Sequence, residues 1–146
     1  MSRAAHVVVV TLGAALVAAC SSPPEPEPLP PGALVAGTAQ VTVNGKDLGQ
    51  FHAVQCSPAG NFLTISTGND QQGSTAVVSN ADGLTAVSVA IRDLSGFTGS
   101  FNQGLGGNAT VSLDGSTYTI TGSADGFDTD NASFRSTGTF TIKAAC

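Results

Sequence analysis

The last thirteen residues of the 146-residue chain alternate between two kinds of side chain. Every second residue from Phe134 to Cys146 is apolar or small, whereas those between them, from Arg135 to Lys143, are Arg, Thr or Lys. An extended strand points successive side chains to opposite faces, so this period of two predicts a strand with one buried face. The same pattern places Cys146 on the apolar face of that strand.

Shorter runs of the same kind recur along the chain, and no segment shows the 3.6-residue apolar stripe of a helix. Asn44-Gly45 and Asp114-Gly115 predict hairpin turns because Asn, Asp and Gly tolerate positive φ, and we expect further breaks at 59–61, 81–83 and Asp125-Gly126. The expected strands are residues 38–43, 50–56, 61–67, 74–79, 84–92, 97–102, 108–113, 117–122 and 133–144. About eight short strands predict an all-β domain, an antiparallel two-sheet sandwich with one disulfide.

The N-terminus has the layout of an exported signal peptide. One cation, Arg3, precedes an apolar run from Val7 to Val17, and small residues lead to Cys20. The run is shorter than the roughly 20 residues that a membrane-spanning helix needs. The sequence Val-Ala-Ala-Cys at 17–20 resembles the lipobox of bacterial lipoproteins, in which the Cys thiol takes a diacylglycerol and becomes the new N-terminus. The alternative is an ordinary secretory signal with a chance Cys near its end.

A proline-rich stretch follows Cys20. Ser21 to Gly32 holds six of the seven prolines of the chain, together with Glu25 and Glu27. Such tracts adopt extended polyproline II at about 3.1 Å per residue, so a dozen residues make a semi-rigid stalk of a few nanometres. We therefore divide the chain into a lipoprotein signal peptide (1–19), a lipidated Cys with a Pro/Glu-rich linker (20–33) and a β-sandwich domain (34–146).

Two cysteines remain once Cys20 is assigned to lipid. In an exported protein an even remainder predicts a disulfide between Cys56 and Cys146. The alternatives are two free thiols or one catalytic thiol, for which His52 is the only histidine in the mature chain that could act as a base.

The sequence contains no clear motif for other catalytic chemistry or for metal binding. No G-x-S-x-G nucleophile elbow is present. The Cys and His residues are too few for the three ligands that a zinc site needs. Asp125, Asp128, Asp130 and Asn131 hint at calcium, but the spacing fails the EF-hand pattern, so an acidic loop is the better interpretation. We predict no catalytic residue, no metal site and no cofactor other than the covalent diacylglycerol or palmitate on Cys20.

The charge of the chain limits its partners. The net charge is −5, and removal of Arg3 with the signal makes it −6. The cations left in the mature chain are Lys46, Arg92, Arg135 and Lys143. A nucleic-acid-binding protein needs a basic face, which these four residues cannot supply.

Three segments carry a resemblance to a known family. They are VNGKDLGQFHAVQCSPAGN at 43–61, SLDGSTYTITGSADGFD at 112–128 and a terminal strand that ends in Cys. With the lipobox, they resemble the mycobacterial 19 kDa lipoprotein antigen family. The resemblance implies a surface lipoprotein with a β-sandwich-like domain and no known enzymatic activity, in which Cys20 matches the lipidated position and Cys56 and Cys146 match paired cysteines. The Pro/Glu-rich linker departs from the Thr-rich, glycosylated linker of the best-known member, so we do not carry glycosylation over.

Two functions from different classes follow. The first is a non-enzymatic surface lipoprotein on the extracytoplasmic face of the cell membrane, with a monomeric domain that acts as an interaction or antigenic module for a host receptor or an envelope lipid. The second is a carrier that binds a lipid or other apolar ligand between its sheets. A carrier needs an apolar cavity. The residues that we expect to line such a cavity, or else to form plain core, are Val87, Val89, Ile91, Phe97 and Phe101.

Overall fold

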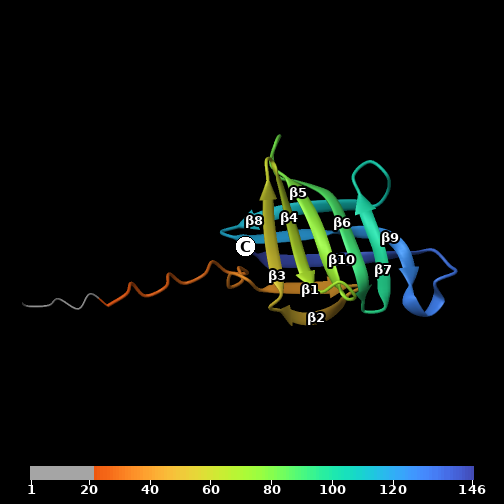
Figure 1. Ribbon diagram of the computed structural model, residues 1–146, viewed down its shortest axis with the longest axis horizontal. Coiled ribbons are helices and arrows are strands. Elements are labelled where there is room, and N and C mark those ends of the chain that lie inside the picture. The colour runs from red at the N-terminus through yellow and green to blue at the C-terminus, as the bar shows by residue number, and fades with distance from the viewer. Residues whose placement is uncertain (1–21) are drawn as a thin grey trace, which may run out of the picture.

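The computed structural model describes residues 22–146, so the signal peptide and Cys20 lie outside the described residues. Residues 22–30 have no regular secondary structure and are exposed, and they extend away from one end of a β domain (Figure 1). The strands are β1 (Ala39–Val43), β2 (Lys46–Phe51), β3 (Val54–Ala59), β4 (Phe62–Gly68), β5 (Gly73–Ser79), β6 (Thr85–Leu94), β7 (Phe97–Asn102), β8 (Asn108–Asp114), β9 (Thr117–Asp128) and β10 (Ser136–Ala145). A short 3-10 helix, η1 (Thr129–Asn131), follows β9.

All ten strands belong to one antiparallel sheet. The hydrogen-bonded order is β2-β1-β10-β9-β7-β6-β5-β4-β3, and β8 pairs with β9 beside this path. The sheet folds over on itself, so that β3 to β7 form one layer and cross the layer of β1, β2, β8, β9 and β10 (Figure 1). The result is a nearly closed, barrel-like sheet whose two edge strands, β2 and β3, follow each other in the sequence.

Strand β9 joins the two layers, and it explains why our expectation of two separate sheets is not confirmed. Residues Thr117–Ser123 pair with β8, whereas the last part of the strand, from Asp125 to Asp128, pairs with β7. Hydrogen bonding therefore continues from one layer to the other instead of stopping at a sheet boundary. The all-β class and the antiparallel pairing are confirmed, but the sheet has ten strands instead of about eight.

Two expected strand boundaries are wrong. Residues 50–56 do not form one strand, because the exposed pair His52-Ala53 separates β2 from β3. The apolar alternation changes phase at this break, between Ala53 and Val54. Strand β2 pairs with β1 and β3 pairs with β4, at opposite edges of the sheet. The expected break at Asp125-Gly126 is also wrong, since both residues lie inside β9.

The C-terminal strand confirms its alternating pattern. In β10, Gly138, Phe140, Ile142 and Ala144 are buried and the intervening Thr and Lys side chains are partly or largely exposed. The two ends of the pattern are exceptions: Phe134 precedes the strand and is 68% exposed, and Cys146 follows the strand and is also exposed. Both sequence-predicted hairpins also form. The β1–β2 turn is Asn44-Gly45, whereas the β8–β9 turn is Gly115-Ser116, one residue later than expected, because Asp114 still pairs with Thr117.

The core lies between the two layers and is built from small and branched apolar side chains. Phe97 is one of its three phenylalanines and is completely buried. Its ring occupies the space where side chains at Gly99 and Gly138 would stand, since a Cβ at Gly138 would come within 2.7 Å of it. Glycine at these positions therefore lets an aromatic ring fill the interior where β7 crosses β10.

Candidate functional site

The stalk meets the domain beside the C-terminus. The Leu34 N–H donates to the buried Thr117 Oγ1 (2.9 Å), and the Gly37 N–H donates to the Ala145 carbonyl (2.9 Å). The Ala145 N–H in turn donates to the Thr38 carbonyl (2.9 Å). The chain that enters from the stalk is thus held at the starts of β1 and β9 and at the end of β10, and the direction in which the stalk leaves is set by these bonds.

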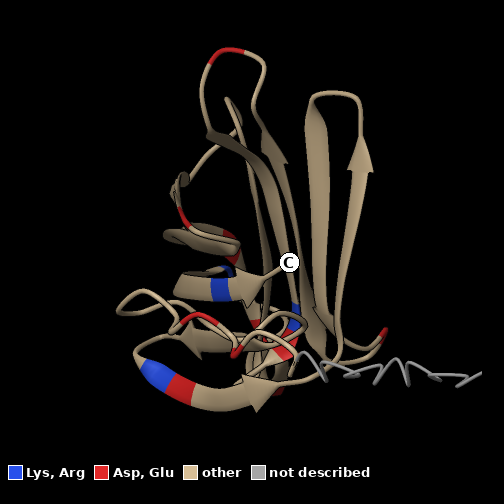
Figure 2. Ribbon diagram, turned by 90° about the vertical axis from the view of Figure 1, so that its left-hand side faces the viewer, with Lys and Arg blue, Asp and Glu red and all other residues tan. Residues whose placement is uncertain are grey.

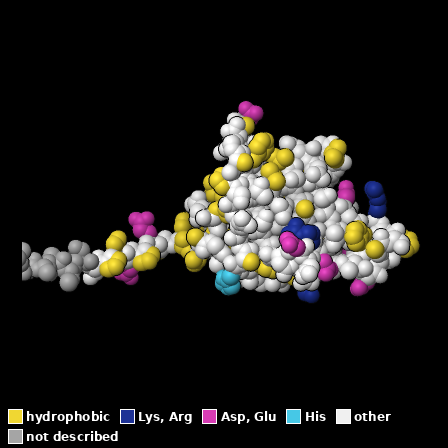
Figure 3. All heavy atoms as spheres, viewed as in Figure 1, with side chains coloured by type: hydrophobic (Ala, Val, Ile, Leu, Met, Phe, Trp, Pro, Cys, Tyr) yellow, Lys and Arg dark blue, Asp and Glu magenta, His cyan; other side chains and the backbone are white. Residues whose placement is uncertain are grey.

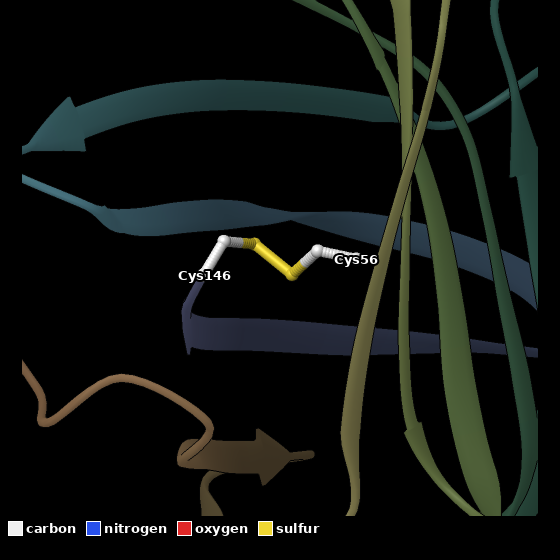
Figure 4. The surroundings of a disulfide bond; sticks show 2 residues. All are labelled: Cys56 and Cys146. Atoms are coloured by element: carbon white, nitrogen blue, oxygen red, sulfur yellow. A yellow bond between two sulfur atoms is a disulfide. The ribbon is translucent and has the colours of Figure 1, made fainter.

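A disulfide joins the same end of the domain to the other layer. Cys56 on β3 is bonded to Cys146 after β10, with a Cα–Cα distance of 5.9 Å across 90 residues of sequence (Figure 4). The Cys146 N–H donates to the Ser116 carbonyl (3.0 Å), which places it at the β8–β9 turn. The predicted pairing of Cys56 with Cys146 is confirmed. Because the Cys56 sulfur is bonded, it offers no nucleophilic thiol, which removes the thiol-enzyme alternative.

The remaining sequence-predicted residues do not form a reactive site. His52 is exposed in the link between β2 and β3. Asp125 and Asp128 lie within β9 and Asp130 lies in η1, so these residues are not one acidic loop. Within residues 22–146 no group of three or more His, Cys, Asp or Glu side chains is placed to hold a metal ion. In the same part of the chain no helix is long and apolar enough to cross a membrane.

The expected cavity residues are mostly core. Val89, Ile91 and Phe97 are at most 1% exposed and belong to the packed cluster between the layers. Phe101 lies at the margin of that cluster and faces a hollow of about 500 Å³ beside β8. Apolar residues of this hollow include Leu84, Ala86, Ala109 and Val111. This hollow lies at the open side of the sheet and involves only one of the five expected residues.

A second hollow, of about 510 Å³, lies at the end of the domain opposite the stalk. It contains three of the large apolar side chains that remain exposed, Leu105, Phe127 and Phe134, together with Asp125 and Arg135. The surface view shows hydrophobic, acidic and basic side chains close together at this end (Figure 3). Sequence reasoning missed this group because its members come from three segments. The one sequence feature that could have indicated this group was Phe134, an aromatic residue that follows the expected break at Asp125-Gly126.

Charged residues elsewhere are dispersed. Figure 2 shows the acidic and basic segments scattered singly or in pairs over the ribbon instead of gathered on one face. Lys46 lies on β2, Arg92 on β6 and Lys143 on β10, while Arg135 lies just before β10.

Comparisons with known proteins agree on one family. The family described as Mycobacterium 19 kDa lipoprotein antigen matches residues 32–146. A protein of Mycobacterium avium subsp. hominissuis, provisionally described as a lipoprotein, is 38% identical over 146 residues, which cover 99% of this chain and 96% of that protein. The lipoprotein LpqH of Mycobacterium tuberculosis H37Rv is 33% identical over 117 residues, which cover 80% of this chain and 72% of LpqH.

Proposed function

Because the chain belongs to the Mycobacterium 19 kDa lipoprotein antigen family, we propose that it is a non-enzymatic lipoprotein held to the outer face of the cell membrane by acyl chains on Cys20. Its β domain then acts as an interaction module, with host receptors among its partners. Family membership itself makes the protein a lipoprotein of the cell envelope. We propose three things beyond family membership: attachment through acyl chains on Cys20, a position on the outer face of the membrane, and host receptors as partners.

The observation that carries the proposal is the junction between stalk and domain. An exposed Pro/Glu stretch reaches the domain at one end, where Leu34 is bonded to Thr117 and Gly37 to Ala145. The Pro/Glu stretch has too few apolar residues to fold on its own, and its length separates the domain from Cys20 by a few nanometres. A diacylglycerol supplies two acyl chains, which suffice for stable anchoring where one chain does not.

The anchor is tested by labelling with palmitate in a mycobacterial host. The unmodified chain is expected to carry label and to sediment with membranes, because both depend on acylation of Cys20. The variant Cys20→Ala is expected to lose both properties. Cys56→Ala is the matched control, since it also removes one sulfur but leaves the lipobox intact. Label and membrane association that persist in Cys20→Ala would refute the anchor.

Recognition by host molecules is supported by membership of a family of lipoprotein antigens. If host cells respond through the acyl groups, the lipidated chain activates innate-receptor reporter cells and the Cys20→Ala chain does not. An equal response to both chains would show that host cells recognise the β domain and not the acyl groups.

A carrier of lipid or another apolar ligand is the second candidate, and the hollow beside β8 favours it. Ala109 and Val111 on β8 line a space of about 500 Å³ together with Leu84 and Phe101. Native mass spectrometry of delipidated protein from its own host is expected to show a retained ligand. Val111→Lys should abolish the added mass, whereas Ser112→Lys, the exposed neighbour on the same strand, should not. Protein of bare mass from the host would exclude this function.

A further inference from the structure

We propose that the hollow at the end opposite the stalk binds a neutral oligosaccharide. We define this distal groove by Leu105, Asp125, Phe127, Phe134 and Arg135, which line it together with small and polar residues. The assignment goes beyond the proposed function, since neither a lipid anchor nor a host response requires a sugar-binding surface.

The distal groove has a floor of sheet and two walls of loop. Its floor is the outer face of the sheet where Ser100 on β7 lies opposite Asp125 on β9. One wall is the loop from β7 to β8, which turns through a bond from the Leu105 N–H to the Asn102 carbonyl (3.0 Å). The other wall follows η1, which is held to the β6–β7 turn by the Thr129 N–H and the Gly96 carbonyl (2.7 Å). The groove is therefore shaped by bonded backbone on both sides.

The apolar part of the distal groove is unusually exposed for a small domain. Leu105 is 86% exposed, Phe134 68% and Phe127 37%. Single exposed apolar side chains are common, but three that line one hollow mark an interaction site. Two phenyl rings supply flat apolar faces against which C–H groups pack well.

Polar groups in the same hollow have bonding capacity left. Asp125 Oδ1 accepts a bond from Thr137 Oγ1 (3.0 Å). Asp125 Oδ2 and the Arg135 guanidinium take part in no side-chain hydrogen bond among the described residues. The loop comes close to this carboxylate, since a Cβ at Gly106 would lie 3.0 Å from Oδ2. The groove therefore presents a strong acceptor, a fork of donors and the Asn102 amide beside the aromatic rings.

This mixture fits a sugar better than the other classes of ligand. Sugar rings combine C–H patches that pack on aromatic faces with hydroxyls that both donate and accept hydrogen bonds. An acyl chain would cover the Asp125 carboxylate and the Arg135 guanidinium without bonding them, which is costly. An anionic polymer would meet repulsion from Asp125, Asp128 and Asp130 with one cation, Arg135, to offset it. A neutral oligosaccharide meets neither cost.

The position of the distal groove supports the same occupant. Thr117, which holds the stalk, and Phe127 lie at the two ends of β9, about 30 Å apart at the rise of a β-strand. The groove thus faces away from the membrane that the proposed anchor implies, so the bilayer itself cannot fill it. This one step rests on the proposed function, whereas the chemistry of the lining does not.

The test is a titration followed by NMR. The probes are chitohexaose and mannohexaose, and the protein is the ¹⁵N-labelled chain from residue 20 onward with Cys20→Ser, which keeps the stalk and every described strand. At least one probe is expected to shift the amides of residues 100–106 and 125–135. Phe134→Ala should weaken binding at least tenfold and Asp125→Asn at least threefold. Phe62→Ala is the matched control, since Phe62 is also exposed but lies on β4, and it should change binding less than twofold.

Three outcomes would overturn the proposal. One is the absence of shifts with both sugars at millimolar concentration. Another is shifts at the same amides with dodecylphosphocholine and none with sugar, which would make the groove a lipid site. The third is concentration-dependent shifts without any ligand, which would assign the groove to a second copy of the chain. Since the tested chain lacks Cys20, failure of the lipid anchor would leave this result unchanged.

Discussion

The two ends of the β domain are built in contrasting ways. At the stalk end, Leu34, Gly37 and Cys146 donate backbone hydrogen bonds to neighbouring segments, and the disulfide adds a covalent link between the layers. At the distal end, loops leave Leu105 and Phe134 mostly exposed around a hollow. Backbone bonds and the disulfide hold the first end, whereas exposed apolar and charged side chains line one hollow at the second.

The contrast separates attachment from recognition. In a chain that is tethered through its N-terminus, the end where the tether enters faces the membrane. Strong bonding at that end holds the domain to its tether. The far end is free to meet other molecules, and exposed apolar groups gathered there mark a binding surface. If this division is right, substitutions at the two ends should have effects of different kinds.

The largest expected effect tests whether the distal end is rigid beneath its exposed surface. Phe97→Ala removes a fully buried ring and should lower the free energy of unfolding by about 3–5 kcal/mol. Phe134→Ala makes the same chemical change at the same end but on the surface, so it should cost no more than about 0.5 kcal/mol. Urea denaturation measures both. A similar cost for the two variants would mean that Phe134 is part of the core.

Removal of the disulfide should have the next largest effect. The double variant Cys56→Ala/Cys146→Ala opens a loop of 90 residues in the unfolded chain and should lose roughly 2–4 kcal/mol of stability. Amide shifts in the distal groove should remain unchanged, because the bond lies at the other end. The unsubstituted protein under reducing conditions serves as a control, since it should lose a similar amount. Altered shifts around Asp125 would show that the two ends are coupled.

The smallest effect is expected at the stalk junction. Thr117→Val keeps the shape of a buried side chain but removes the acceptor for the Leu34 N–H, which should cost about 1 kcal/mol. Faster hydrogen exchange at Leu34 and quicker proteolysis near residue 34 would report the loosened junction. Thr119→Val, two residues along the same strand, is the control. If exchange at Leu34 is unchanged in Thr117→Val, this bond does not hold the stalk.

Patterns within one strand were predictable from the sequence, but pairing between distant strands was not. The β8–β9 hairpin and the alternation within β10 depend on neighbouring residues alone, and both are confirmed, although the turn lies at Gly115-Ser116. The disulfide followed from counting cysteines. The division of residues 50–56 depends on which strands lie beside β2 and β3, and alternation reports only the buried face.

The distal half of β9 and the distal groove were missed for a related reason. Residues 123–128 are rich in Gly and Asp, which disfavour strands, so local propensity indicated a loop. Pairing with β7 on one side and β10 on the other overrides this preference. Leu105 and Phe134 are 29 positions apart, and only the completed sheet brings them to one hollow.

The junction at β1 has a mechanical consequence. The stalk extends along nearly the same direction as β1, which pairs with β10 over five residues and with β2 on its other side (Figure 1). A pull on the tether would act along β1, across hydrogen bonds that lie perpendicular to the strand. Such a force shears the whole ladder at once instead of opening it bond by bond. The domain should therefore withstand tension from its tether better than tension applied across the same strands.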